Sequence, residues 1–321
     1  TRILEQGGRR KALLRVARRT ILLYALGIIC YGGMSNSWPD IRLMGVLNRI
    51  ALCYGLGSLL FCFVRPRGLA VISAVLLLGY WAALAWIPFP DVRPTPGGDQ
   101  VITRDNHPDV SRLNMASTNL IRGSYLQGVN LANYVDQKYL PGYRWDGTYD
   151  PEGLLSTIPA VVTCLLGLFA GLLLRSAAWD DHRKVLILIG SGVGALLVGF
   201  LWGTQLPIIK KIWTSSYVLV AGGYSAILRG VFYWLVDVKN YRKWCQPFVW
   251  IGMNSITIYM VNNLVGGFDK LATRLVGGDL AAFFDRHLAQ GMGSLIVALV
   301  GLALAIWFVQ FLHSRKVFIR L

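Results

Sequence analysis

The sequence contains few charged residues for its length. Only 15% of its 321 residues are Asp, Glu, Lys or Arg, whereas 55% are hydrophobic, and the mean hydropathy is +0.50. A water-soluble chain of this length needs a much larger charged surface, so the composition excludes ordinary soluble domains. Acidic residues are especially scarce, with 16 against 32 basic residues and a net charge of +16. Such an excess of basic residues is typical of proteins that bind nucleic acid or that hold basic loops against the anionic face of a membrane.

Cysteines with the spacing of a metal site or a disulfide framework are also missing. Four of the five cysteines lie in apolar segments, and no C-x-x-C spacing occurs. This pattern excludes a disulfide scaffold and gives no reason to expect a bound metal ion. The four histidines stand outside any recognisable catalytic setting, although His107 and His287 fall in segments predicted to be external.

The sequence contains long runs of apolar residues. A helix needs about 20 residues to cross the hydrocarbon layer, and seven runs reach or approach that length, while an eighth, near the start, is shorter. The predicted spans are residues 20–32, 46–64, 69–88, 154–174, 185–202, 217–236, 248–265 and 292–312. We therefore predict an all-α, polytopic membrane helix bundle of about eight spans, forming one domain over residues 1–321 with an external loop at 89–153.

Basic residues are distributed unevenly over the alternate loops of this bundle. One set of loops holds 18 Lys and Arg in 53 positions and the other holds 12 in 120, so the first set is about three times denser. Lys and Arg accumulate in cytoplasmic loops, which predicts that both termini are cytoplasmic and accounts for much of the net charge without nucleic acid. The denser set is residues 1–19, 65–68, 175–184, 237–247 and 313–321; the other is 31–45, 89–153, 203–216 and 266–291.

The predicted external loop is the longest polar stretch, and it holds half of all the acidic residues. Aromatic rings beside amide and carboxylate groups are what a sugar site needs, because the apolar face of a sugar stacks on a ring while its hydroxyls find hydrogen-bond partners. The alternative is that the loop folds over the helix ends and buries its own rings. The rings in question are Tyr125, Tyr134, Tyr139, Tyr143, Trp145 and Tyr149.

Polar residues at or inside the spans are costly in hydrocarbon and are therefore functional candidates. Those predicted to converge on the outer side are Asn48, Arg49, Asp150, Glu152, Lys210, Lys211, Trp213 and Asn262. For Asp150 an N-cap role before Pro151 remains open, and for the two lysines ordinary anchoring at the interface remains open.

Two further polar residues lie on the cytoplasmic half of the bundle. Asn254 is either a binding residue or a hydrogen-bonding contact between helices. Arg229, deep in the predicted sixth span, needs a carbonyl, a distant acid or a ligand phosphate as its partner.

Several strings occur in a characteristic order over nearly the whole chain. They are residues 41–49 (IRLMGVLNR), 130–136 (NLANYVD), 149–157 (YDPEGLLST), 207–217 (PIIKKIWTSSY), 252–255 (GMNS) and 315–318 (RKVF). Together they resemble the heparan-alpha-glucosaminide N-acetyltransferase family and its bacterial relatives. The motif residues of that family correspond here to Arg49, Asp150, Glu152, Lys211, Trp213 and Asn254.

The resemblance implies a membrane enzyme that moves an acetyl group from cytoplasmic acetyl-CoA to the amine of a glucosamine-type sugar on the other side. We place the protein in a bacterial inner membrane and expect membrane lipid and the amino sugar as partners, while a homo-oligomer stays open. We predict Asp150 and Glu152 as catalytic residues. We predict as substrate-binding or cofactor-binding residues Asn48, Arg49, Lys210, Lys211, Trp213, Asn254 and Asn262.

The chain departs from the family pattern in two ways. The family has an Asn between the Pro and the Lys of the 207–217 string, where this chain has Ile209. Family members also begin with two further spans and a His-Ala-x-Trp-Asn-Gly string whose His is catalytic, and no such string occurs in this sequence. We therefore expect ten spans in the intact protein and expect this chain to lack the catalytic His, so that inactivity of the chain alone stays open.

Three functions follow from these patterns. In the transferase, the missing His deprotonates the amine or carries the acetyl group, and the choice between direct transfer and an acyl-enzyme stays open. Asp150 or Glu152 orients that His or holds the ammonium group, while Arg49 and the two lysines offset charge on CoA phosphate or the carbonyl oxygen. The alternatives are an amino-sugar transporter, which an internal repeat of broken helices would favour, and a non-catalytic scaffold.

Overall fold

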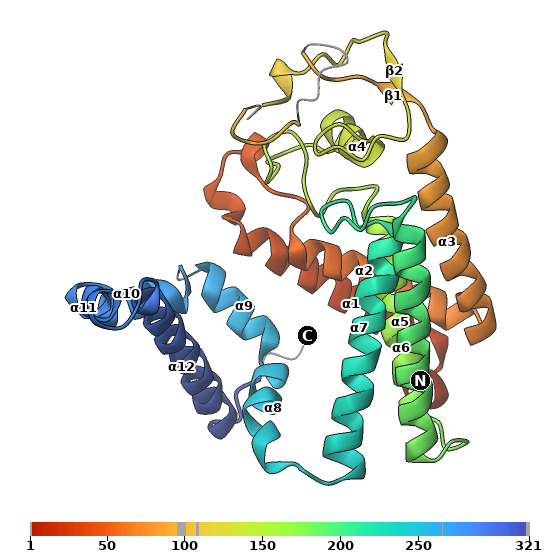
Figure 1. Ribbon diagram of the computed structural model, residues 1–321. Helices are drawn as coiled ribbons and strands as arrows, with labels where there is room; N and C mark the ends of the chain where they lie inside the picture. The colour runs from red at the N-terminus through yellow and green to blue at the C-terminus, as the bar shows by residue number, and fades with distance from the viewer. Residues whose placement is uncertain (1, 95–100, 107–108, 265, 319–321) are drawn as a thin grey trace. The chain divides into compact units, whose positions relative to one another are not determined.

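The computed structural model describes residues 2–94, 101–106, 109–264 and 266–318. Contacts divide the chain into two compact units, Thr1–Val238 and Lys239–Leu321, which are described separately. Both units are built mainly from helices (Figure 1). The prediction that residues 1–321 form a single domain stays a prediction.

Six helices among the described residues are long and apolar enough to cross a membrane. They are α2 (Val46–Phe63), α3 (Pro66–Trp86), α5 (Thr157–Arg175), α6 (Asp181–Gly203), α7 (Ser215–Tyr233, continued by the π-helical turn η4, Trp234–Val238) and α12 (Met292–Ser314). They confirm the predicted all-α polytopic membrane bundle, and the protein is therefore an integral membrane protein.

Two of the eight predicted spans have a different form. The first lies in the second half of α1 (Arg2–Cys30), a longer helix with a kink at Gly8, where φ is +71°, and with a basic first half. The seventh is interrupted at Asn254, which separates α8 (Gln246–Met253) from α9 (Ser255–Leu264). Helices of 8 and 10 residues are roughly 12–15 Å long, too short to cross the hydrocarbon layer singly. Residue 265, the predicted end of that span, lies outside the described residues.

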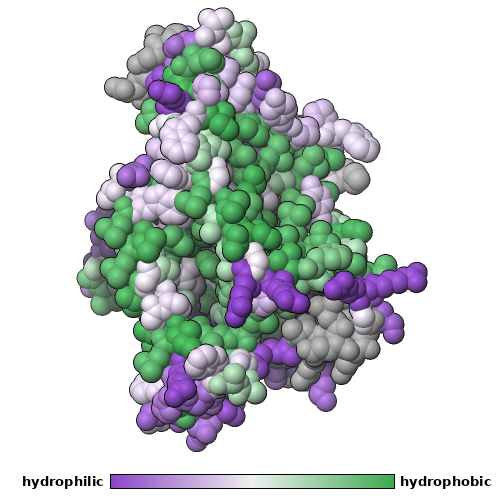
Figure 2. Space-filling model, turned by 90° about the vertical axis from the view of Figure 1, so that its right-hand side faces the viewer, coloured by the Kyte–Doolittle hydropathy of each residue, from purple (hydrophilic) through white to green (hydrophobic). Residues whose placement is uncertain are grey.

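The helices of the first unit pack in antiparallel pairs. Helix α1 lies along α2, α6 lies along α7, and α5 contacts α2, α3 and α7. Small residues allow the closest approach, because a Cβ atom added to Gly192 of α6 would lie 2.8 Å from the carbonyl oxygen of Gly223 in α7. On the outside, Leu186 and Leu201 of α6 are 69% and 72% exposed. Figure 2 shows such hydrophobic side chains over much of the helical surface, as contact with lipid requires.

The predicted external loop is folded onto the ends of the helices. It contains β1 (Phe89–Pro90) paired antiparallel with β2 (Leu120–Ile121), the short turn η3 (Val110–Arg112) and helix α4 (Leu131–Tyr139). One buried cluster within it joins Val92, Ile102, Leu113 and Val129. A second cluster joins Phe89, Leu131 and Ala132 of the loop to Tyr80 and Leu84 of α3 and to Leu206 and Ile212. These contacts fix the loop to the helix ends.

The remaining short elements connect the helices. The 3-10 turns η1 (Gly33–Ser35) and η2 (Trp38–Asp40) lie between α1 and α2. In the second unit, η5 (Lys243–Cys245) precedes α8, and the amphipathic helices α10 (Gly267–Val276) and α11 (Asp279–His287) both pack on α12.

Candidate functional site

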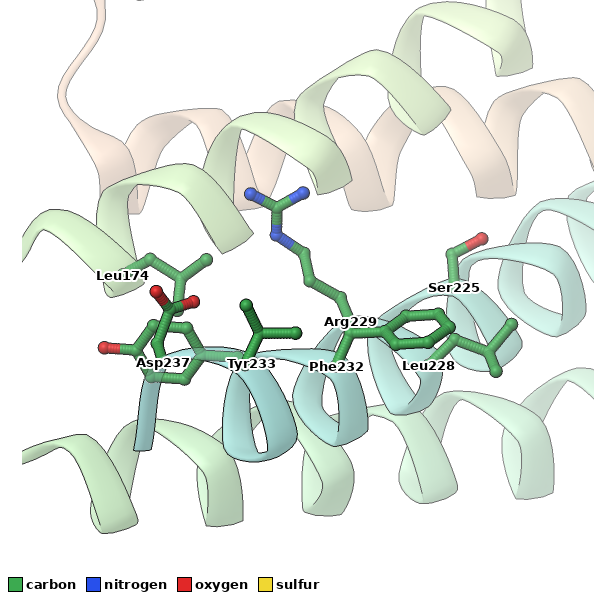
Figure 3. A pocket seen from close by; sticks show the side chains of 8 residues that line it. Leu174, Ser225, Leu228, Arg229, Phe232, Tyr233 and Asp237 are labelled. Atoms are coloured by element: carbon green, nitrogen blue, oxygen red, sulfur yellow. The ribbon is translucent and has the colours of Figure 1, made fainter. Parts of the chain in front are cut away.

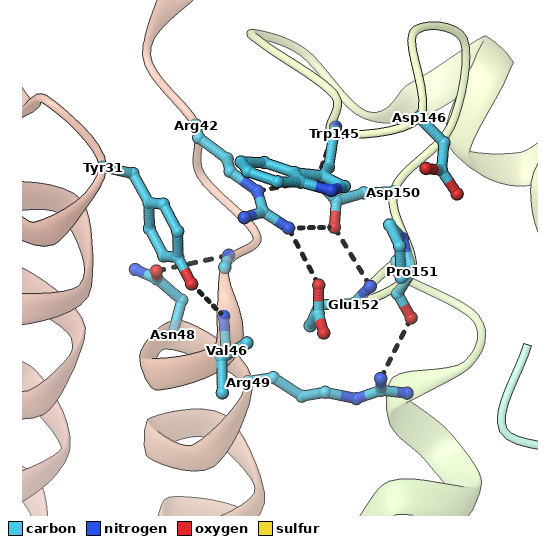
Figure 4. A network of polar contacts seen from close by, with 12 residues as sticks. Tyr31, Arg42, Val46, Asn48, Arg49, Trp145, Asp146, Asp150, Pro151 and Glu152 are labelled. Atoms are coloured by element: carbon cyan, nitrogen blue, oxygen red, sulfur yellow. Dashed lines mark hydrogen bonds and ion pairs between the residues drawn. The ribbon is translucent and has the colours of Figure 1, made fainter. Parts of the chain in front are cut away.

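A buried arginine in the segment before α2 joins the two predicted catalytic carboxylates (Figure 4). Arg42 donates from Nε to Asp150 Oδ2 over 2.9 Å and from Nη2 to Asp150 Oδ1 over 2.7 Å, which makes the contact bidentate. The same Nη2 donates to Glu152 Oε2 over 2.8 Å. The sequence therefore brings Asp150 and Glu152 together as predicted, but around a residue that was not among the candidates.

Asp150 is fully engaged by its surroundings. Besides the two bonds from Arg42, it accepts from the backbone N–H of Trp145 over 3.1 Å and of Glu152 over 3.0 Å, and its side chain is 0% exposed. These four bonds shape the turn at residues 145–152 and leave Asp150 little capacity for a substrate. The alternative that Asp150 is the N-cap of the following helix is wrong, because α5 begins at Thr157 and Ser156 occupies its N-cap position.

Glu152 is the more accessible of the two carboxylates. Its side chain is 18% exposed, and one of its oxygens accepts from Arg42. Burial, together with the neighbouring negative charge of Asp150, raises the pKa of Glu152 to about 7, although Arg42 and Arg49 oppose this shift. A carboxyl group that exchanges its proton near neutral pH is suited to acid–base chemistry.

A third carboxylate, that of Asp136, is buried and binds the backbone next to the turn at residues 145–152. Asp136 in α4 is 2% exposed and accepts from the backbone N–H of Leu154 over 2.8 Å. Burial raises the pKa of Asp136 to about 7. Gly153 lies directly against it, since a Cβ atom added there would be only 1.9 Å from Asp136 Oδ2. Asp136 and Gly153 thereby fix the backbone that carries Glu152.

Arg49 connects α2 to two other elements. Its guanidinium donates to the carbonyl oxygens of Pro151 (3.1 Å) and Ser156 (2.5 Å), and it lies 4.3 Å from the centre of the Trp213 ring. Trp213 in turn donates from Nε1 to Thr163 Oγ1 of α5 over 3.1 Å. Arg49 and Trp213 are thus neighbours of the carboxylate cluster, as predicted, and their observed contacts hold α2, α5 and the 207–214 segment together.

The other predicted residues of the first unit have different surroundings. Asn48 is 0% exposed, donates to the carbonyl oxygen of Tyr24 over 2.9 Å and so joins α2 to α1. Lys211 forms an ion pair of 2.7 Å with Asp146, four residues before Asp150. The side chain of Lys210 is exposed and forms no hydrogen bond or ion pair with any residue that the structure describes. Ile209, at the departure from the family pattern, packs on the cluster that fixes the loop.

Asn254 and Asn262 lie in the second unit, so their predicted share in the same site stays a prediction. Asn254 is 2% exposed, and its amide donates over 3.4 Å to the carbonyl oxygen of Trp250 in α8. Its Oδ1 atom is buried without a hydrogen-bond partner among the described residues. Asn262 is exposed in α9, near Gly267.

Four of the six rings of the loop bear on the two predicted alternatives. Tyr149 is 0% exposed, and Tyr125 and Tyr134 pack against the cluster that fixes the loop, as the alternative of self-burial requires. Trp145 is 48% exposed, and its ring centre lies 5.0 Å from the Arg42 guanidinium carbon. Trp145 is therefore the ring of the loop that lies beside the carboxylates and is also open to solvent.

Arg42 could have been found from the sequence by one signal. It is the single basic residue of the predicted outer segment 31–45, and it belongs to the 41–49 string. Its partners lie 108 and 110 positions away, so no local pattern pairs them.

Of the histidines, His107 lies outside the described residues, and His287 stacks on Phe283 in the second unit.

The fold and this cluster define a polytopic membrane protein with a buried charged site at the ends of its helices. No family model matches the sequence. Two curated proteins, each named heparan-alpha-glucosaminide N-acetyltransferase, match 99% of the chain: the one from Mus musculus at 26% identity and the one from Homo sapiens at 27%. The chain spans about half the length of these relatives, 51% and 50%. The matches support a distant relationship between the chain and the heparan-alpha-glucosaminide N-acetyltransferases.

Proposed function

We propose that this chain forms the membrane-embedded part of an acyltransferase that moves an acetyl group from acetyl-CoA to the amine of a glucosamine-type sugar. The observation that carries the proposal is the cluster of Arg42, Asp150 and Glu152, in which one carboxyl group is partly exposed and has a raised pKa. The names of the two curated relatives support the reaction class.

The chemistry requires a proton acceptor beside the sugar. The amine nitrogen attacks the carbonyl carbon of the thioester, the carbon–sulfur bond breaks, and the CoA thiolate leaves. A sugar ammonium group must lose a proton before this attack, and a carboxylate with a pKa near 7 can accept it at neutral pH. Glu152 has this role in our proposal, while Arg42 and Asp150 position its carboxylate as a rigid pair.

Binding of the sugar is assigned to the exposed side of the cluster. The half-exposed ring of Trp145 offers an apolar face for a pyranose, and the Lys211–Asp146 pair lies at the same turn. Arg49 is held by backbone carbonyls, so its role in our proposal is to keep α2 and α5 in register around the site.

The charge distribution supports an orientation in which both ends of this chain face the cytoplasm. The resemblance adds that acetyl-CoA is supplied from the cytoplasm and that the acceptor lies on the opposite side of a bacterial inner membrane. The resemblance also implies upstream spans with a catalytic His. The complete reaction is therefore proposed for a protein that contains those spans together with this chain.

The test is acetyl transfer from radiolabelled acetyl-CoA to glucosamine in membrane vesicles. A version with the upstream spans is compared with the same version carrying Glu152→Gln, and with the matched control Asp105→Asn, which neutralises an exposed acid of the same loop. We expect transfer by the unaltered and control proteins and a loss of at least about 100-fold with Glu152→Gln. Equal transfer by all three would refute the role of Glu152.

One observation favours a second function. The helix break at Asn254 resembles the discontinuous helices that hold substrates in many transporters. The same vesicles test it, because an amino-sugar transporter accumulates labelled glucosamine inside them without acetyl-CoA. Accumulation without acetylation would replace the transferase by the transporter.

A further inference from the structure

A second charged site lies at the far end of α7 from the carboxylate cluster (Figure 3). A groove of about 630 Å³ runs along one side of α7 and η4 and is bordered by Leu174 of α5. All of its lining residues belong to the unit Thr1–Val238. Four of them are apolar: Leu174, Leu228, Phe232 and Val236. This end of α7 is the one that the charge distribution predicts to be cytoplasmic.

Arg229 places a cation in this apolar groove. It lies 14 residues after Ser215, roughly 20 Å along the helix, and its neighbours Leu228 and Phe232 are 55% and 46% exposed. Among the residues that the structure describes, no carboxylate forms an ion pair with Arg229, and Figure 3 shows its guanidinium extending away from α7. An arginine in such surroundings is costly unless an anion or water meets it.

Asp237 provides an opposite charge along the same groove. It lies in η4, and within the described part of the chain it has no ion pair with Arg229 or with any other cation. Between the two charges, Tyr233 donates from its hydroxyl to Asp181 of α6 over 2.8 Å, which fastens this end of α7 to α6. A π-helical turn is rare and is often found at functional sites. The groove thus presents a cation and an anion at separate places along an apolar surface.

We propose that this groove binds a phospholipid whose headgroup carries both a phosphate and an amine, as phosphatidylethanolamine does. The phosphate accepts hydrogen bonds from the Arg229 guanidinium, for which its geometry is well matched, and the ammonium group donates to the Asp237 carboxylate. The acyl chains extend from the phosphate away from Asp237, along Leu228, while Phe232 and Leu174 flank the headgroup. This proposal goes beyond the transferase reaction and does not depend on it.

The lipid accounts for features that a soluble phosphate compound leaves unexplained. The apolar walls beside the two charges suit acyl chains, whereas a nucleotide phosphate such as that of coenzyme A would need only Arg229. Asp237 would repel a ligand that carries only negative charge. The amine is therefore the part of the headgroup that gives the site its selectivity.

The experiment measures the thermal midpoint Tm of the purified, delipidated full chain in detergent as a function of added lipid. Phosphatidylethanolamine is compared with phosphatidylcholine, which has no N–H donor, with phosphatidylglycerol, which has no amine, and with coenzyme A. The variants are Arg229→Gln, Arg229→Lys and Asp237→Asn. Arg67→Gln is the matched control, because it removes an exposed arginine from the first turn of α3, in a segment predicted to lie on the same side.

We expect the unaltered chain and the control to be stabilised by phosphatidylethanolamine at about tenfold lower lipid concentration than by phosphatidylcholine. Asp237→Asn removes this preference, and Arg229→Gln weakens binding of every phospholipid by about tenfold or more. If Arg229→Gln does not fold, Arg229→Lys still has to bind phosphatidylethanolamine more weakly than the unaltered chain. Equal stabilisation by phosphatidylethanolamine and phosphatidylcholine, stabilisation by coenzyme A alone, or unchanged binding by the Arg229 variants would overturn the proposal.

Discussion

Replacing Arg42 by Gln is expected to destabilise the protein strongly. The substitution removes three charge-assisted hydrogen bonds, two to Asp150 and one to Glu152, and leaves Asp150 buried at 0% side-chain exposure without its counter-ion. Removing one partner of a buried ion pair costs about 3–5 kcal/mol, mainly because the other charge stays buried. The free energy of unfolding is therefore expected to fall by about that amount.

A double-mutant cycle separates the ion pair from other effects of the substitution. Asp150→Asn alone leaves Arg42 with one charged partner, Glu152, and in the double variant Arg42→Gln/Asp150→Asn neither charge of the main pair remains. The double variant is expected to lose less stability than the sum of the two single variants, with a coupling of about 2 kcal/mol or more. Arg122→Gln, at an exposed position of the loop, is the matched control and is expected to change stability by less than about 0.5 kcal/mol.

The assay is reversible unfolding of the purified protein in mixed micelles by a titration with sodium dodecyl sulfate, followed by tryptophan fluorescence. Additive losses in the cycle, or an Arg42→Gln variant as stable as the control, would show that the buried pair does not hold the turn. The Arg42–Asp150 pair would then not be what fixes the position of Glu152.

Three further predictions concern the same unit. Gly153→Ala places a Cβ atom 1.9 Å from Asp136 Oδ2, so we expect a loss of about 1–3 kcal/mol in the same titration; full stability would mean that the turn is loosely packed. Because the pKa of Glu152 is raised to about 7, the folded state binds more protons than the unfolded state between about pH 4.5 and 7. The contribution of Glu152 to the free energy of unfolding therefore falls as pH rises from about 4.5 to 7, and Glu152→Gln should remove this part of the pH dependence. If the variant shows the same dependence of stability on pH, the pKa of Glu152 is not raised. Gly192→Val puts side-chain atoms against the backbone of Gly223, because even a Cβ atom at Gly192 would be 2.8 Å from the Gly223 carbonyl oxygen. We expect this variant to lower Tm by several degrees. Gly190→Val, at a position with open space, is expected to leave Tm unchanged.

Length and apolarity were enough to predict most of the membrane-spanning helices. Six of the expected spans are single helices in the structure, because a continuous run of about 20 apolar residues has few other stable forms in lipid. The interruption at Asn254 was not predicted, since hydropathy is continuous across it and the break is visible only in the backbone. The length of α1 was missed for the opposite reason, because its basic first half has no apolar signal.

The candidate site was predicted only in part. Polarity close to predicted spans pointed to Asp150, Glu152, Arg49 and Trp213, and all four lie in one neighbourhood of the structure. Arg42 was missed because its function depends on partners more than 100 positions away, which no local pattern connects. The division of labour between a fully bonded Asp150 and a partly exposed Glu152 likewise depends on tertiary contacts.

If Glu152 accepts the proton of the sugar amine, the rate of acetyl transfer depends on the protonation state of Glu152, and a pH profile measures this dependence. Initial rates of labelled acetyl transfer to glucosamine are measured from pH 5 to 9 in vesicles that contain the chain together with the upstream spans. We expect the rate of the unaltered protein to rise with pH through about 7, as Glu152 loses its proton, and we expect Glu152→Gln to abolish this rise. A rise through the same pH range that Glu152→Gln leaves intact would show that Glu152 is not the proton acceptor.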